Sequence, residues 1–110
     1  MTVRELQKQL KLETLAAEEK MDDVTVEDIY IGDMLSWVIG NAEAGSAWIT
    51  IQTNVNIIAV AVMVGIHCIL IAENASVDSE TLMRAEEEGI PLLRTDLTAY
   101  QIAKKIDLGN

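Results

Sequence analysis

The second half of the chain repeats one pattern three times, in which a short apolar segment is followed by a helical segment. The apolar segments have the length and residue types of β-strands, and the three pairs are 46–52 with 54–65, 66–72 with 78–89, and 90–95 with 97–106. Strands that alternate with helices over short loops are parallel and are joined by right-handed crossovers. The pattern therefore predicts an α/β domain with a mainly parallel sheet built from consecutive βα units.

Three details refine this prediction. The nearly continuous apolar run 66–72 (IHCILIA) is typical of a central strand that is covered on both faces. Pro91 cannot donate a ladder hydrogen bond, so its strand begins there or lies at an edge. Gly65 and Gly89 each follow a helical segment, where a left-handed C-terminal cap belongs.

The first 31 residues are less regular. Thr2 and Glu5 form a capping box, which predicts a helix over residues 3–10, and residues 11–16 (KLETLA) resemble a short strand. Apolar residues alternate over residues 23–31, but the phase of the alternation slips. The slip predicts either a β-bulge or a break between two short strands.

A further short helix is expected over residues 34–40 (MLSWVIG). Asp33 precedes it and is predicted to cap its N-terminus, while Gly40 is predicted to end it in a left-handed conformation. The segment 34–40 and the helix 55–64 are both too apolar to bury all of their surface in a small domain. We therefore expect one of these helices to pack against a second copy in a homodimer.

Size, charge and cysteine content limit the possible functions. A chain of 110 residues is most simply one domain, residues 1–110, and its net charge of -10 disfavours binding to nucleic acid and to anionic membrane surfaces. The apolar region 57–72 is shorter than the roughly 20 residues of a membrane span, and no export signal is visible at the start of the chain. The single cysteine, Cys68, agrees with a reducing compartment, so we expect a cytoplasmic protein.

The polar residues at the strand ends are the candidate ligand site. Ligands of parallel sheets usually lie beyond the carboxyl ends of the strands, where helix N-termini present free N–H groups. We predict a pocket for a small metabolite or nucleotide, and its candidate residues are Gln52, Thr53, Asn54 and Glu73, with Asp33 and Ser36, while Asn74, Thr95 and Asp96 share the same rim. The alternative is structural: Thr53 or Asn54, Asp78, and Thr95 or Asp96 only cap the helices that follow them.

Catalytic motifs are absent from the sequence. It contains no GxxxxGK[ST], GxGxxG or GxSxG motif, and His67 and Cys68 are strand neighbours whose side chains point to opposite faces. Cys68 is expected to be a buried, unreactive thiol, and no metal or other cofactor is expected. The remaining catalytic alternative is a magnesium-dependent enzyme that uses carboxylates, for which the candidate set is Asp33, Glu73 and Asp96.

Two long segments, YIGDMLSWVIGNAEAGSAWITIQTNVNIIAVAVMVGIHCILIAE and EEEGIPLLRTDLTAYQIAKKI, resemble the DRTGG domain family, and in particular its small stand-alone members. This family is related to the N-terminal domain of HPr kinase/phosphorylase, and similar domains accompany CBS domains in regulatable pyrophosphatases. The resemblance covers essentially the whole chain. Gly32 and Asp33 match the "GD" of the family, but the tract that names the family is DVTVEDI here, which keeps Asp23 without the arginine or the paired glycines.

The resemblance implies a three-layer α/β/α fold and a regulatory or ligand-sensing role, commonly as a dimer, without kinase activity. A histidine that often follows the TIQT segment in the family is Asn54 here, so acid–base chemistry at this position is not expected. Stand-alone members are often encoded near iron hydrogenase and redox genes. A second possible role is therefore that of a protein-interaction scaffold or accessory subunit of a redox or hydrogenase-related system.

Overall fold

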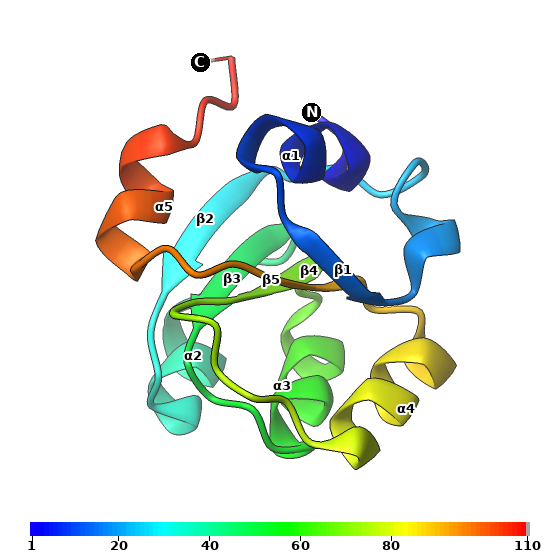
Figure 1. Ribbon diagram of the computed structural model, residues 1–110. Helices are drawn as coiled ribbons and strands as arrows, with labels where there is room; N and C mark the ends of the chain where they lie inside the picture. Colours follow the sequence, from blue (N-terminus) through cyan, green and yellow to red (C-terminus); the bar gives the residue numbers. More distant parts are fainter. Residues whose placement is uncertain (110) are drawn as a thin grey trace.

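A computed structural model of the chain describes residues 1–109, in which five strands form one sheet with helices on both faces (Figure 1). The strands are β1 (Glu13–Ala16), β2 (Asp28–Ile31), β3 (Ser46–Thr50), β4 (Cys68–Ile71) and β5 (Leu92–Arg94). The helices are α1 (Val3–Leu10), the 3-10 turn η1 (Glu18–Lys20), α2 (Leu35–Asn41), α3 (Asn56–Val64), α4 (Ser79–Glu88) and α5 (Ala99–Lys105).

The strand order is β1-β5-β4-β3-β2, and the four strands from β2 to β5 are parallel. This confirms the predicted α/β fold with consecutive βα units. The strand β4 lies in the centre of the sheet, as its apolar run predicts, and Pro91 immediately precedes β5. The antiparallel pairing of β1 with β5, which makes β1 an edge strand, was not predicted from the sequence.

Alternating side chains of the strands fill two separate cores. On one face, Ala47, Ile49, Cys68 and Leu70 pack with the buried side of α1 and with Ile102 of α5. On the other face, the strands pack against α2, α3 and α4 (Figure 1), and the fully buried members of this core include Val38, Trp48, Ile57, Ile58, Ala61, Ile69, Ile71, Ala85 and Leu92. The arrangement has the three helix, sheet and helix layers that the family resemblance implies.

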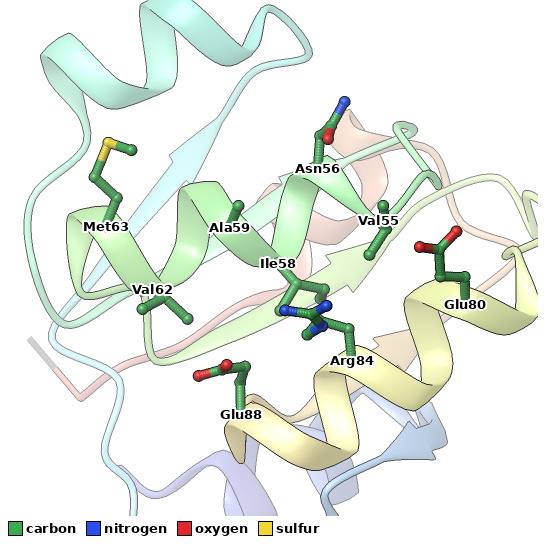
Figure 2. A pocket seen from close by; sticks show the side chains of 9 residues that line it. All are labelled: Val55, Asn56, Ile58, Ala59, Val62, Met63, Glu80, Arg84 and Glu88. Atoms are coloured by element: carbon green, nitrogen blue, oxygen red, sulfur yellow. The ribbon is translucent and has the colours of Figure 1, made fainter.

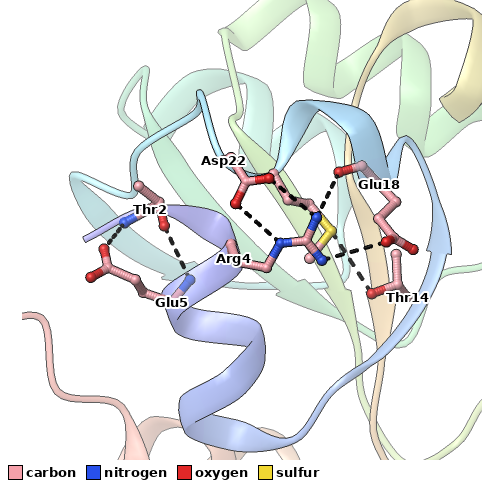
Figure 3. Close-up of polar contacts among 7 residues, drawn as sticks. Thr2, Arg4, Glu5, Thr14, Glu18 and Asp22 are labelled. Atoms are coloured by element: carbon pink, nitrogen blue, oxygen red, sulfur yellow. Dashed lines mark hydrogen bonds and ion pairs between the residues drawn. The ribbon is translucent and has the colours of Figure 1, made fainter.

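The helix α1 has the predicted bounds, and side-chain hydrogen bonds hold its first turn in place. Thr2 and Glu5 make the capping box, with Thr2 N donating to Glu5 Oε1 at 2.7 Å (Figure 3). That hydrogen bond lowers the pKa of Glu5 below its usual value, because it stabilises the charged carboxylate. Arg4 donates to both carboxylate oxygens of Asp22 and lies 3.5 Å from Glu18, which connects α1 to the turn after β1.

The two phase-shifted segments of residues 23–31 are separated by a break. Only Asp28–Ile31 forms a strand, while Thr25 makes an isolated antiparallel bridge with Thr2. The predicted glycine caps are confirmed for α3 and α4, because Gly65 and Gly89 both have positive φ, 87° and 67°. A left-handed backbone is easily accessible only to glycine, which has no Cβ.

Two predictions about α2 were wrong. Asp33 does not cap it: Met34 is the N-cap residue, and the Asp33 carboxylate is occupied by donors from the end of β3. Gly40 does not end the helix, which continues to Asn41 and leaves through Ala42 in an extended conformation. The Asn41 side-chain amide donates to the carbonyl of Trp37 at 2.9 Å, and the amide of Ala42 donates to the carbonyl of Val38, so the helix ends without a left-handed residue.

Within the described residues no helix reaches the length and hydropathy needed to cross a bilayer.

The indole of Trp48 connects the second core to the turn that precedes α2. Trp48 is fully buried, and its Nε1 donates to the carbonyl oxygen of Gly32 at 2.8 Å. The other tryptophan, Trp37, is 63% exposed on α2. The pair therefore provides a test in which the same substitution is made in a buried and in an exposed place.

We predict that Trp48→Phe lowers the free energy of unfolding by about 2–4 kcal/mol, because it leaves a cavity and an unpaired Gly32 carbonyl. Trp37→Phe should change it by less than about 0.5 kcal/mol. Urea unfolding followed by far-ultraviolet circular dichroism measures both values without relying on tryptophan fluorescence. Equal effects of the two substitutions would contradict this account of the second core.

Candidate functional site

The carboxyl ends of β2 and β3 are joined by a hydrogen-bonded group of polar residues with Thr50 at its centre. Thr50 is 2% exposed, and its hydroxyl donates to Asp33 Oδ1 at 2.8 Å and accepts from the Gln52 amide N–H at 3.1 Å. The same Asp33 oxygen accepts from the amide of Ile51 at 3.0 Å. The Asp33 carboxylate is thus held in place by two donors from the neighbouring strand.

The side chain of Gln52 closes this group. Its Nε2 donates to the backbone oxygen of Asp33 at 2.9 Å, so Asp33 and Gln52 contact each other both through Thr50 and directly. The sequence predicted that these two residues would share one edge of the sheet, and the structure brings them together. It did not predict the role of Thr50, which would be recognisable only as a polar residue at the end of an otherwise apolar strand.

The next two rim residues are connected to helices. The backbone oxygen of Thr53 accepts from the hydroxyl of Thr81, a fully buried residue of α4, at 2.7 Å. Asn54 Oδ1 accepts from the amide of Asn56 at 2.9 Å, which satisfies one free N–H group in the first turn of α3. The N-cap residue of α3 is nevertheless Val55, which makes no side-chain capping hydrogen bond, so neither Thr53 nor Asn54 occupies the cap position that the structural alternative predicted.

Glu73 and Asn74 lie at the end of β4 and have left-handed backbones, with φ values of 59° and 53°. Their amides donate to the carbonyl oxygens of Leu97 and Thr95, so the backbone of this turn is bound to the loop after β5. The side chains of Glu73 and Asn74 are exposed, as is that of Ser36 on α2. Hydrogen bonds connect Glu73 to the β5 side of the rim, whereas Asp33 and Gln52 are connected to each other on the β2–β3 side.

The other predicted caps differ from the observed ones. The N-cap residue of α5 is Thr98, which makes a second capping box with Gln101, so neither Thr95 nor Asp96 caps this helix. Thr95 Oγ1 instead accepts from the amide of Leu97. Asp78 is the N-cap residue of α4, as predicted by position, but its side chain makes no capping hydrogen bond.

The carboxylates of the rim do not form a cation site. Over residues 1–109, no three side chains of histidine, cysteine, aspartate or glutamate converge closely enough to hold a metal ion. Asp33, Glu73 and Asp96 therefore lack the arrangement that the magnesium-dependent alternative requires. Asp33 is also engaged by Thr50 and Ile51, and its Oδ1 accepts two hydrogen bonds.

His67 and Cys68 are separated as the strand geometry predicts. Cys68 is fully buried in the core beneath α1 and α5, and burial raises the pKa of its thiol to about 12. The thiol is therefore protonated at neutral pH and is a poor nucleophile. His67 Nδ1 instead contacts the backbone oxygen of Thr25, outside that core.

A groove between α3 and α4 encloses about 460 Å³ (Figure 2). Its lining is mostly apolar on the α3 side, where Asn56 is the polar exception, and charged on α4. It consists of Val55, Asn56, Ile58, Ala59, Val62, Met63, Glu80, Arg84 and Glu88. A second, smaller hollow of about 320 Å³ lies between β2 and the end of α5. None of the six predicted ligand-binding residues lines either hollow.

The outer surfaces of α2 and α3 expose large apolar side chains. We call this surface the α2–α3 face and define it by Met34, Trp37, Ile39 and Met63, which are between 43% and 67% exposed. Neither helix contains a charged residue, although the whole chain carries a net charge of -10. Met63 also lines the groove between α3 and α4, so the groove and the α2–α3 face meet at this side chain (Figure 2).

Comparison with known proteins gives one family and a structural neighbour. The sequence pattern of the DRTGG domain matches residues 5–108. A similar solved structure is that of the CBS and DRTGG domains of the regulatory region of Clostridium perfringens pyrophosphatase, complexed with the activator diadenosine tetraphosphate. The TM-score is 0.76 at 13% identity, over 94% of this chain and 45% of that chain, so this chain spans less than half of its neighbour. No curated protein gave a significant match.

We predict that Thr50→Val lowers the free energy of unfolding by about 1–3 kcal/mol, because Gln52 N–H loses its acceptor and Asp33 loses a donor. Ser36→Ala is the matched control at an exposed rim position and should change this value by less than about 0.5 kcal/mol. Chemical denaturation of both variants measures the difference. A Thr50→Val protein as stable as the control would show that the polar group does not stabilise the rim.

Proposed function

We propose that this chain, which belongs to the DRTGG domain family, is a non-catalytic regulatory module that acts as a homodimer. The observation that carries the proposal is the α2–α3 face, an exposed apolar surface on two helices without charge. The architecture of the neighbouring regulatory region from pyrophosphatase supports a regulatory role by analogy of fold. In this proposal the module works through contacts with other molecules.

Electrostatics favour a second copy as the partner of this face. Two chains that each carry a charge of -10 repel each other, so self-association is favourable where the contact surfaces are free of charge. The α2–α3 face meets this condition, because Met34, Trp37 and Met63 are apolar and their helices contain only uncharged residues. An isologous dimer would bury Trp37 and Met63 of both copies, and large apolar side chains of this kind dominate the energy of interfaces.

We predict that Trp37→Lys weakens dimerisation at least tenfold, because it places two positive charges in an apolar contact. Met83→Lys is the control: Met83 is 64% exposed, like Trp37 at 63%, but it lies on α4 outside the α2–α3 face. Sedimentation equilibrium over a range of micromolar concentrations measures the dimer constant of each protein. A monomeric wild-type chain would refute the homodimer, and equal effects of the two substitutions would refute this choice of interface.

A second candidate function is the sensing of a small ligand at the strand-end rim, where Gln52, Glu73 and Asp33 lie. Two observations favour it. Glu73 and Asn74 have consecutive left-handed backbones, a strained conformation that is common at binding sites, and the neighbouring regulatory region was crystallised with an activating nucleotide. The carboxylates of Asp33 and Glu73 repel phosphates. We therefore expect the rim to bind the nucleoside part of such a ligand rather than its polyphosphate.

Isothermal titration with adenosine and with diadenosine tetraphosphate tests the second candidate. We predict that adenosine binds at least as tightly as the polyphosphate and that Gln52→Ala weakens both at least tenfold. Asn41→Ala, at the C-terminal end of α2 and away from the rim, should leave binding unchanged. Titrations without heat for both compounds at millimolar concentration would rule out nucleotide sensing at this rim while leaving the homodimer proposal intact.

A further inference from the structure

The groove between α3 and α4 differs from the α2–α3 face in its charge. Its floor is apolar and comes from α3, where Val55, Ile58, Ala59 and Val62 line it. Its other wall is α4, from which Glu80, Arg84 and Glu88 project toward α3 in Figure 2. The groove therefore combines an apolar floor with one charged wall, which is the composition of a site for an amphipathic helix.

The charges of this wall are unbalanced. Arg84 lies between Glu80 and Glu88 along α4 and lines the groove with them, and its ion pair with Glu87, 3.6 Å from Nε to Oε2, joins two side chains that are more than half exposed. An exposed pair of this kind is weak, so the wall carries two carboxylates against one guanidinium. No ion pair joins Glu80 or Glu88 to a cation within residues 1–109. The two carboxylates are eight residues apart on one helix, which corresponds to a separation of about 12 Å at a rise of about 1.5 Å per residue.

We propose that this groove binds an amphipathic basic helix of a partner protein, with apolar residues on the floor and lysine or arginine residues opposite Glu80 and Glu88. To face Glu80 and Glu88, the basic residues of the partner helix must be about seven or eight positions apart, with an apolar stripe beside them. This inference rests on the proposed regulatory role and names the kind of partner through which the module acts.

A second copy of this chain fits the groove poorly. A net charge of -10 repels the acidic wall, and the basic residues of α1 and α5 belong to helices whose apolar sides are buried in the opposite layer. The groove and the α2–α3 face share Met63 at their border but differ in charge, so the groove takes a basic helix and the α2–α3 face takes a second copy. The two surfaces differ in this way because α4 contains charged residues and α2 contains none.

The test uses a fluorescent peptide of about 15 residues, long enough for partial helix formation, with a leucine stripe and two lysines spaced to face Glu80 and Glu88. A matched peptide carries glutamate in place of both lysines, and a scrambled peptide has the same composition without the stripe. Fluorescence anisotropy with the full chain should give binding of the lysine peptide at least tenfold tighter than that of either control. Equal binding of the lysine and glutamate peptides, or of the scrambled peptide, would overturn the proposal.

Substitutions in the protein locate the site. Val62→Lys on the floor should weaken the lysine peptide at least tenfold, and Met83→Lys, which adds the same charge outside the groove, should weaken it less than twofold. Glu88→Lys should weaken it about fivefold or more, whereas Asp23→Lys, with the same change in net charge on an exposed position of another turn, should not. If the two substitutions of either pair weaken binding equally, the peptide binds through general charge attraction, and the groove is not its binding site.

Sedimentation of the same variants separates this inference from the dimer proposal. Val62→Lys should leave the dimer constant unchanged while it weakens peptide binding at least tenfold, and Trp37→Lys should weaken the dimer while it leaves peptide binding unchanged. If Val62→Lys instead dissociates a dimer, a second copy occupies the groove and the basic-helix proposal is wrong. If the wild-type chain is monomeric but binds the lysine peptide selectively, the groove proposal stands and the homodimer does not.

Discussion

The burial of β3 and β4 on both faces is the constraint on which the rest of the structure depends. Every residue of Ser46–Thr50 and Cys68–Ile71 is buried, so side chains of each strand enter two different cores. A strand of this kind is stable only when helices cover both sides, because each uncovered face would expose a row of large apolar side chains. The crossover helices α2, α3 and α4 supply one cover, and the terminal helices α1 and α5 supply the other (Figure 1).

The same constraint confines polar chemistry to the strand ends. Thr50 is the last residue of β3, where the apolar core ends. Its hydroxyl donates to Asp33, which follows β2, and so connects the ends of the two neighbouring strands. Around it, Asp33 and Gln52 use much of their hydrogen-bonding capacity on one another and on the backbone. Polar residues at this rim therefore have a structural role of their own, and any ligand would bind beside an already organised network.

Charge divides the outer surface of the α2, α3 and α4 layer. The helices α2 and α3 are neutral, whereas α4 carries acidic residues along the edge that lies against α3. In a chain with a net charge of -10, this separation is the basis of our two proposals, in which the neutral helices meet a second copy and the wall of α4 meets a partner of opposite charge.

The sequence by itself determined the parallel core of the fold. Its periodic apolar segments predicted the succession of strands and helices along the second half of the chain, a central place for β4, and the caps at Gly65 and Gly89, because these features depend on local patterns. It also placed Asp33 and Gln52 at one rim. Three features were decided only by the tertiary structure. The edge strand β1 pairs with β5 in the antiparallel direction, Asp33 accepts a hydrogen bond from Thr50 instead of capping α2, and α3 and α4 form a groove. Each of these depends on contacts between residues far apart in the chain, which no local spacing encodes.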